Sequence, residues 1–339
     1  MKVRALLKGA VFTSIFVILF LLLQNVIVCD PKSTDQARLD TAFTQSENSL
    51  DGVFLGPSTT YASWVAPIAF KEYGITVYSM SSAAQPLFAA KYMIDDMRRK
   101  QPDAVYIINI THYLVGFDKY LPNFLESYPL TLNKIKMTAY LSSLADFSLK
   151  EKFEVFCPIF KYHERWNNVS EKDFMPLEDK YKSASYYSSF LNKRKNIGEL
   201  QSDFTTREDL SATDYKGLTE LMNYCNEENV KVLFVIMPQG ADVKGRAGKQ
   251  NTSVSVLEAR GFDVLDLRLY TDEIGLDPRK DFYNSKHMNI SGATKVTRFI
   301  SDYLTEKYNL TDKRGDSDFS DWEAAAAEYT ELLKTAKAS

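Results

Sequence analysis

The sequence predicts an α/β protein, a three-layer sandwich in which a mostly parallel sheet lies between two layers of helices. Short, continuously apolar segments alternate with segments of helical period, and Gly, Pro and Ser residues separate them. Such strands are typical of a parallel sheet that is covered on both faces. The chain has 339 residues, 45% hydrophobic and 25% charged, which excludes a disordered or disulfide-scaffold protein and allows one or two domains.

The N-terminus (residues 1–29) indicates a membrane segment. Three basic residues come first, Lys2, Arg4 and Lys8. The apolar stretch Gly9–Cys29 is then long enough to cross a hydrocarbon core of about 30 Å. This order predicts an uncleaved signal anchor, a single-pass span that leaves the body outside the cytoplasm. A cleavable signal peptide is the alternative, although no A-x-A-like site follows; Cys29 also lacks the small preceding residue of a lipidation site.

The rest of the chain divides into three parts. We expect a polar tether at 30–49, the α/β domain at 50–308, and a polar C-terminal tail with one helix at 309–339. The expected strands are Val53–Leu55, Ile75–Met80, Ala104–Ile110, Val232–Met237 and Phe262–Leu267. The expected helices are Pro67–Tyr73, Leu87–Lys100, Asp214–Asn229 and one from an N-cap at Ser291 to about Tyr308.

An insertion at about 112–212 interrupts this alternation. It is rich in aromatic residues, among them Tyr113, Phe117, Tyr120, Tyr162, Trp166, Tyr186 and Tyr187. One interpretation is an insertion with an aromatic core of its own. The other is a surface on which sugar rings stack beside the active site.

Ser58 and His287 are the residues best placed for chemistry. Ser58 stands in a Gly-Pro-Ser turn directly after a buried strand, where its hydroxyl is presented outward and nearby backbone N–H groups can bind an oxyanion. His287 lies just before the last helix of the domain, and imidazole can accept a serine proton near neutral pH. Each feature alone is ordinary, but together they favour a nucleophile and its base.

Several segments resemble the SGNH/GDSL hydrolases. Leu55–Ser58 is similar to the first block of that family, which carries the nucleophile, and Asn284–His287 is similar to its last block, Asp-x-x-His. Further segments resemble a membrane-anchored bacterial branch that includes the teichoic-acid D-alanyl-transfer protein and the alginate O-acetylation proteins: Tyr78–Leu87, Lys161–Trp166 and Gly275–Pro278. The resemblance implies an SGNH-hydrolase-like, flavodoxin-like fold.

The resemblance also implies roles for individual residues. Ser58 would be the nucleophile and His287 the general base. The oxyanion hole would take the Ser58 N–H, Ser82 (or Ser81) where the family has glycine, and Asn109 where the family has its third-block asparagine.

One position departs from the family: Asn284 stands where the Asp that orients the histidine is expected. In serine proteases this replacement lowers turnover about 10⁴-fold, because the histidine takes the wrong tautomer. Three interpretations remain open. Asp281 replaces the acid, a backbone carbonyl holds His287 in a dyad, or the protein is an inactive relative that binds polymer or a partner.

The resulting function is acyl-ester chemistry through an acyl-Ser58 intermediate, as an esterase or an O-acyltransferase. The expected partners are a cell-envelope glycan or acylated polymer and a membrane-bound O-acyltransferase. The rival is a non-catalytic protein that binds glycan or that transferase. A formal charge of −3 without a clustered basic face argues against nucleic acid. We expect no cofactor and no catalytic metal, because the three histidines (His112, His163 and His287) have no metal-ligand spacing.

Overall fold

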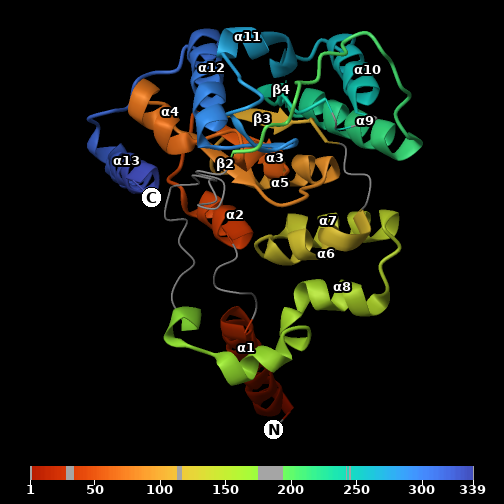
Figure 1. Cartoon of the computed structure of the whole chain (residues 1–339). Helices are drawn as coiled ribbons and strands as arrows, with labels where there is room; N and C mark the ends of the chain where they lie inside the picture. Colours follow the sequence, from red (N-terminus) through yellow and green to blue (C-terminus); the bar gives the residue numbers. More distant parts are fainter. Residues whose placement is uncertain are drawn as a thin grey trace.

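The computed structural model describes residues 2–27, 34–112, 117–174, 194–241, 243 and 246–338. Cys29, Tyr113, Tyr186 and Tyr187, noted above, lie outside these described residues. The described part is an α/β body from which one apolar helix projects (Figure 1).

The body contains a five-stranded sheet in the order β2-β1-β3-β4-β5, and all neighbouring strands are parallel. This confirms the predicted α/β class and the parallel sheet. Each strand overlaps the segment expected for it: β1 (Gly52–Gly56), β2 (Val77–Ser81), β3 (Val105–Asn109), β4 (Val232–Ile236) and β5 (Val264–Asp266).

Both faces of the sheet are covered, because every residue of β1, β2 and β3 is buried. The chain passes from β1 outward to β2 and then crosses back over β1 to β3. Right-handed connections therefore place the helices before and after β2 on opposite faces. This strand order is that of doubly wound, flavodoxin-like sheets, which bind ligands where the direction reverses, here between β1 and β3.

Helices connect the strands where the periodic segments predict them. α4 (Ala66–Tyr73) has Pro67 in its first turn and ends at Gly74, whose φ of 72° is left-handed, as the sequence predicts. The others are α3 (Ser58–Tyr61), η1 (Leu87–Ala89), α5 (Ala90–Arg98), α9 (Ala212–Glu227), α10 (Ala247–Glu258), η6 (Leu267–Tyr270), α11 (Thr271–Ile274) and α12 (Ile290–Tyr308).

The N-cap of α12 is Asn289, so the expectation of Ser291 was wrong by two residues. Asn289 Oδ1 accepts hydrogen bonds from the N–H groups of Ser291 at 3.0 Å and Gly292 at 3.3 Å. The Ser291 hydroxyl instead donates to Asp281 Oδ1 at 2.6 Å. The asparagine amide therefore caps the helix, and the serine hydroxyl ties the helix start to the preceding loop.

The segment expected to be a polar tether contains a helix that belongs to the core. α2 (Thr34–Thr44) packs against β2, and its Leu39 and Ala42 are fully buried. Tyr78 OH in β2 donates to the Arg38 carbonyl at 2.9 Å. Ala37 and Arg38 are buried as well, so the buried side of α2 includes a charged residue, and the composition of 30–49 is polar although the helix packs on the core.

The described part of the insertion folds as helices against the body. They are α6 (Phe117–Ser127), α7 (Leu132–Leu144), α8 (Leu149–Phe156), η2 (Pro158–Phe160), η3 (His163–Asn168) and η4 (Glu171–Phe174). α6 contacts α2, and α7 contacts α5. Leu125, Tyr128 and Leu141 belong to the same hydrophobic cluster as the sheet. A separate aromatic core is therefore wrong for α6–α8, whose buried residues join the core of the body.

The C-terminal segment also packs on the body, after the short η7 (Ser317–Phe319). α13 (Ser320–Ala338) lies against α4, and its Trp322 and Tyr329 are buried. The rings of Trp322 and Phe70 are 5.8 Å apart. The expected helix is present, and it packs on the core through Trp322, Tyr329 and two buried alanines.

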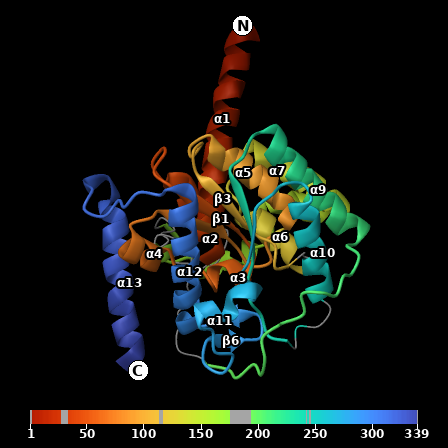
Figure 2. The same cartoon turned by 90° about the horizontal axis from the view of Figure 1, so that it is seen from above.

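α1 (Lys2–Ile27) is the single candidate membrane span in the described part of the chain. Its segment Val3–Leu23 is long and apolar enough to cross a bilayer, and none of it is buried in the body. Figures 1 and 2 show α1 projecting away from the sheet and its helices. The length and apolar character suit a signal anchor and a signal sequence equally.

Candidate active site

Ser58 is the first residue of α3 and follows β1 across a single residue. Pro57 is the N-cap of α3 in an extended conformation, with φ −75° and ψ −170°. The first N–H groups of a helix have no acceptor within the helix. In the described part of the chain the Ser58 N–H has no hydrogen-bond partner, and the Ser58 side chain is half-buried. The turn thus presents a hydroxyl and an unused N–H together.

Gly56 allows this turn to pack tightly against β3. Its φ is +148°, and a Cβ on it would lie 2.4 Å from Thr60 Oγ1 and 2.7 Å from Asn109 Cβ. No larger residue fits between α3 and the end of β3 without a shift of one of them. The glycine therefore fixes the distance between the two elements that meet at the β1/β3 switch point.

His287 reaches Ser58 from a hairpin far along the chain. β6 (Phe282–Asn284) and β7 (His287–Met288) pair antiparallel, with Asn284 opposite His287. His287 Nε2 lies 2.8 Å from Ser58 Oγ. The two residues expected to act together are thus within hydrogen-bond distance.

Asn284 holds the other nitrogen of the His287 ring. Its Oδ1 lies 3.1 Å from His287 Nδ1 and accepts the backbone N–H groups of Lys286 at 2.9 Å and His287 at 3.0 Å. Backbone N–H groups only donate, so they identify the amide atom that faces the ring as the oxygen. His287 Nδ1 must then carry the proton, which leaves the Nε2 lone pair directed at Ser58.

The environment keeps His287 neutral. Burial is the main cause, followed by the nearby Lys286 ammonium, and together they lower the pKa of His287 from 6.5 to about 4. At neutral pH the ring is therefore a proton acceptor at Nε2. Asn284 supplies no negative charge that would raise this pKa.

Asp281 lies in a different contact network from His287. Its carboxylate accepts hydrogen bonds from the Ser291 hydroxyl at 2.6 Å, Lys295 Nζ at 2.7 Å and the Asp277 N–H at 2.7 Å. It is almost fully buried, and a buried carboxylate requires such donors. The structure thus gives the orienting contact to Asn284, and Asp281 fixes the start of α12.

The two further expected oxyanion donors are engaged elsewhere. Asn109 Nδ2 donates to the hydroxyls of Thr59 and Thr60, both at 3.0 Å. The Ser82 N–H donates to the Gly56 carbonyl at 3.4 Å, and its hydroxyl contacts Gln85 Oε1 at 3.4 Å. Asn109 therefore positions α3, and of the three expected oxyanion donors the Ser58 N–H is the one with no hydrogen-bond partner in the described part of the chain.

Sequence reasoning missed the residues of α2 that bind the end of β2 and the loop after it. Arg38 Nε donates to the Ser81 carbonyl at 2.9 Å, and Asp35 Oδ2 accepts the Ala83 N–H at 2.9 Å. The Arg38 guanidinium also lies 4.3 Å from the centre of the Tyr61 ring in α3. The sequence does not predict these contacts, because the polar composition of 30–49 indicates a tether.

A buried hydrogen-bond chain supports Asn109 from the other side. Arg268, itself paired with Asp266 at 2.6 Å, donates to Gln250 Oε1 at 3.0 Å. Gln250 Nε2 donates to the Thr111 carbonyl at 2.8 Å, and the Thr111 N–H donates to Asn109 Oδ1 at 2.9 Å. Because each buried polar group has a partner, this network fixes the rotamer of Asn109.

The other two histidines, and the two cysteines that the structure describes, lie outside this series of hydrogen bonds. His112 contacts Gln239 Nε2 at 2.9 Å and the Arg246 guanidinium, and His163 Nδ1 lies 2.9 Å from the Phe160 carbonyl. Cys157 and Cys225 are free thiols.

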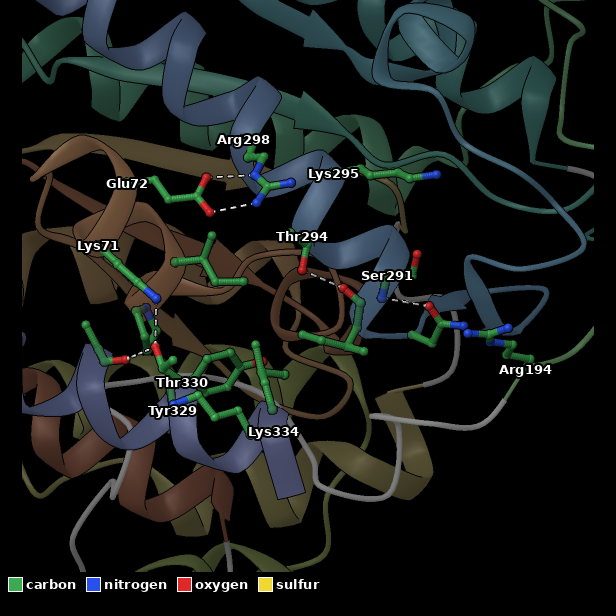
Figure 3. Close-up of a pocket in the computed structure, with 16 residues that line it drawn as sticks. Lys71, Glu72, Arg194, Ser291, Thr294, Lys295, Arg298, Tyr329, Thr330 and Lys334 are labelled. Atoms are coloured by element: carbon green, nitrogen blue, oxygen red, sulfur yellow. Dashed lines mark hydrogen bonds and ion pairs between the residues drawn. The ribbon is translucent and has the colours of Figure 1, made fainter. Parts of the chain in front are cut away.

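A groove of about 780 Å³ opens between α4, α12 and α13 (Figure 3). Neither Ser58 nor His287 lines it. Two of its cations have carboxylate partners: Arg298 forms two 2.7 Å bonds to Glu72, and Lys295 Nζ lies 2.7 Å from Asp281 Oδ2. The groove is therefore separate from the serine and histidine.

Comparison with protein-family models finds no match to this chain, and comparison with curated proteins finds none either.

Proposed function

We propose that this chain is a serine-dependent acyl-ester hydrolase or O-acyltransferase of the SGNH type that acts on a cell-envelope polysaccharide or a similar polymer. The observation that carries the proposal is the hydrogen-bonded series Ser58 Oγ–His287 Nε2 and His287 Nδ1–Asn284 Oδ1. It supplies a nucleophile, a neutral base in the required tautomer and a residue that orients the base.

The reaction follows from these positions. Ser58 Oγ attacks the carbonyl carbon of an ester or thioester while His287 Nε2 takes its proton, and the Ser58 N–H donates to the developing oxyanion. The protonated His287 then gives the proton to the leaving group, which produces acyl-Ser58. Water or a sugar hydroxyl, deprotonated by His287, attacks the acyl carbon, and the protonated His287 returns that proton to Ser58 Oγ as the acyl–oxygen bond breaks.

The N-terminal helix supports a location at the membrane. We propose that α1 is an uncleaved anchor and that Lys2, Arg4 and Lys8 keep its start in the cytoplasm. The body then works outside the cytoplasm, beside an envelope polymer and a membrane-bound O-acyltransferase partner.

A second function is favoured by one observation. Asn284 brings no charge to His287, so the imidazolium formed during acyl transfer lacks the stabilisation that an aspartate gives. The alternative is a catalytically impaired protein that binds glycan or the transferase partner. Such a protein would keep the fold, but its rate of acyl transfer would be low.

Hydrolysis of p-nitrophenyl acetate by the full chain in detergent separates the two functions. For the enzyme, we expect Ser58→Ala and His287→Ala to lower the rate by about 10³-fold or more. The exposed Ser143 and His163 supply matched alanine controls, which should leave the rate unchanged. A folded parent without turnover, or a Ser58→Ala variant as fast as the parent, would support the binding protein.

A further inference from the structure

Among the described residues outside α1, the large exposed apolar side chains gather in one part of the chain. Nine of them lie between residues 120 and 174: Tyr120, Leu130, Leu132, Ile135, Leu149, Phe153, Phe160, Trp166 and Phe174. The rest of the described body exposes three: Tyr215, Leu269 and Tyr270. A water-facing surface seldom concentrates such residues without a partner that covers them.

This segment touches the apolar helix. η2, η3 and η4 each contact α1, and Figure 1 shows them beside it. Exposure is lower near the C-terminal end of α1, with 38% at Leu21 and Leu23 and 58% at Leu22, against 77% at Leu6 and 71% at Phe12. The contact therefore lies toward the C-terminal end of the candidate span.

The place where η2–η4 contact α1 determines how deep these elements lie relative to the bilayer. Val3–Leu23 has 21 residues. At 1.5 Å per residue such a helix matches a hydrocarbon core of about 30 Å, so its two ends lie near the two membrane surfaces. Elements that contact its C-terminal end then lie at the interface where the chain leaves the bilayer.

The exposed side chains of α8, η2 and η3 are of the kinds found at the membrane interface. Trp166 is 60% exposed, Phe160 is 55% exposed, and the Phe160 and Phe153 rings are 5.3 Å apart. Lys161 Nζ lies 5.0 Å from the centre of the Tyr162 ring. Aromatic rings beside lysines are typical of the headgroup region, where apolar parts enter the acyl boundary and charges stay in water.

We propose that α8 and η2–η4 form a lipid-binding surface in the headgroup layer of the leaflet where α1 ends, with Phe153, Phe160 and Trp166 as anchors. The proposal rests on α1 crossing the membrane and is independent of catalysis. A lipid surface fits better than a protein partner, because the apolar side chains are spread over four short elements, which a fluid interface accommodates without a matched shape. Such a surface would hold the body at a fixed height above the bilayer.

The tryptophans allow a direct test. The chain has three, and Trp64 and Trp322 are 0% and 2% exposed. The full chain is placed in nanodiscs of phosphatidylcholine, with or without acyl chains brominated near the headgroup, and tryptophan emission is compared. We expect lower emission in the brominated discs, and a Trp166→Phe variant whose emission is the same in both.

A relocated tryptophan is the matched control. Tyr215 on α9 is 47% exposed and lies outside the proposed surface. In the Trp166→Phe background, Tyr215→Trp should emit equally in both kinds of disc. Equal emission of the parent in both discs would overturn the proposal and point to a protein partner on this surface. Quenching of the Tyr215→Trp variant to the same degree as the parent would also overturn it.

Discussion

At the scale of single residues, the site depends on which atom of the Asn284 amide meets His287. An amide that turns its NH₂ group to the ring forces the wrong tautomer, which explains the large loss in serine proteases. Here the N–H groups of Lys286 and His287 hold the oxygen toward the ring. The tautomer is therefore preserved, and only the negative charge of an aspartate is missing.

Replacing Asn284 by Asp should therefore raise activity. A carboxylate in contact with the ring stabilises the imidazolium, and we expect kcat/KM for p-nitrophenyl acetate to rise about tenfold. Asn284→Ala, which releases the ring, should lower it by about a hundredfold. The exposed Asn196 provides a neutral control as Asn196→Asp. A lower rate in Asn284→Asp with an unchanged circular dichroism spectrum would contradict this role.

The pH dependence of the reaction follows from the same residue. His287 accepts the Ser58 proton only when neutral, and its pKa is lowered to about 4. The kcat/KM of the parent should therefore stay level from neutral pH down to about 5 and fall as pH drops through about 4. In Asn284→Asp the fall should come at a higher pH. A parent profile with its midpoint near 6.5, the ordinary histidine value, would be incompatible with the buried neutral ring.

At the scale of elements, the sequence predicts those strands and helices that have a strong local pattern and does not predict how the polar segments pack on the core. The five strands and α4 could be predicted because continuous apolar runs and the Pro67 and Gly74 signals are local. The polar composition of 30–49 predicts a tether, and that of 309–339 predicts a polar tail with one helix. The packing of both segments on the core is not evident from composition, because the buried residues of α2 include Arg38 and two of the four described in α13 are alanines. The Ser58–His287 pairing could be expected from residue chemistry, but the position of Asn284 opposite His287 depends on the β6–β7 hairpin.

The contribution of α2 to the fold can be measured with one leucine. Leu39 is fully buried in the common core, so Leu39→Ala should lower the free energy of unfolding by about 2–5 kcal/mol. Leu269, which is 59% exposed, is the matched control, and Leu269→Ala should change stability by less than about 0.5 kcal/mol. Urea unfolding followed by circular dichroism gives both values. Equal, small effects would mean that α2 is a tether after all.

The tight turn before Ser58 makes a second element-scale prediction. Gly56→Ala must move Thr60 or Asn109 and place alanine at a φ of +148°, so we expect a loss of about 3 kcal/mol and a slower reaction. Gly261 also has a positive φ, 78°, but open space around it. Gly261→Ala should therefore cost about 1 kcal/mol and leave the rate unchanged. If the two variants were alike, close packing at the turn would not matter.

At the scale of the whole molecule, the topology brings distant segments to one point. The strand order places the carboxyl ends of β1 and β3 beside each other, with Ser58 after the first and Asn109 at the end of the second. The sequence could predict that these ends converge, because that property belongs to every parallel sheet. It could not predict that the Asn109 amide binds Thr59 and Thr60, because that choice depends on the exact packing of α3 against β3.

An activated Ser58 is the central claim, and covalent labelling tests it most directly. The full chain in detergent is incubated with a fluorophosphonate, beside Ser58→Ala, and both are examined by intact mass spectrometry. We expect one adduct per chain on the parent and none on Ser58→Ala, because only a serine with a base at hydrogen-bond distance attacks the phosphorus rapidly. No adduct on a folded parent, or an equal adduct on Ser58→Ala, would contradict the claim.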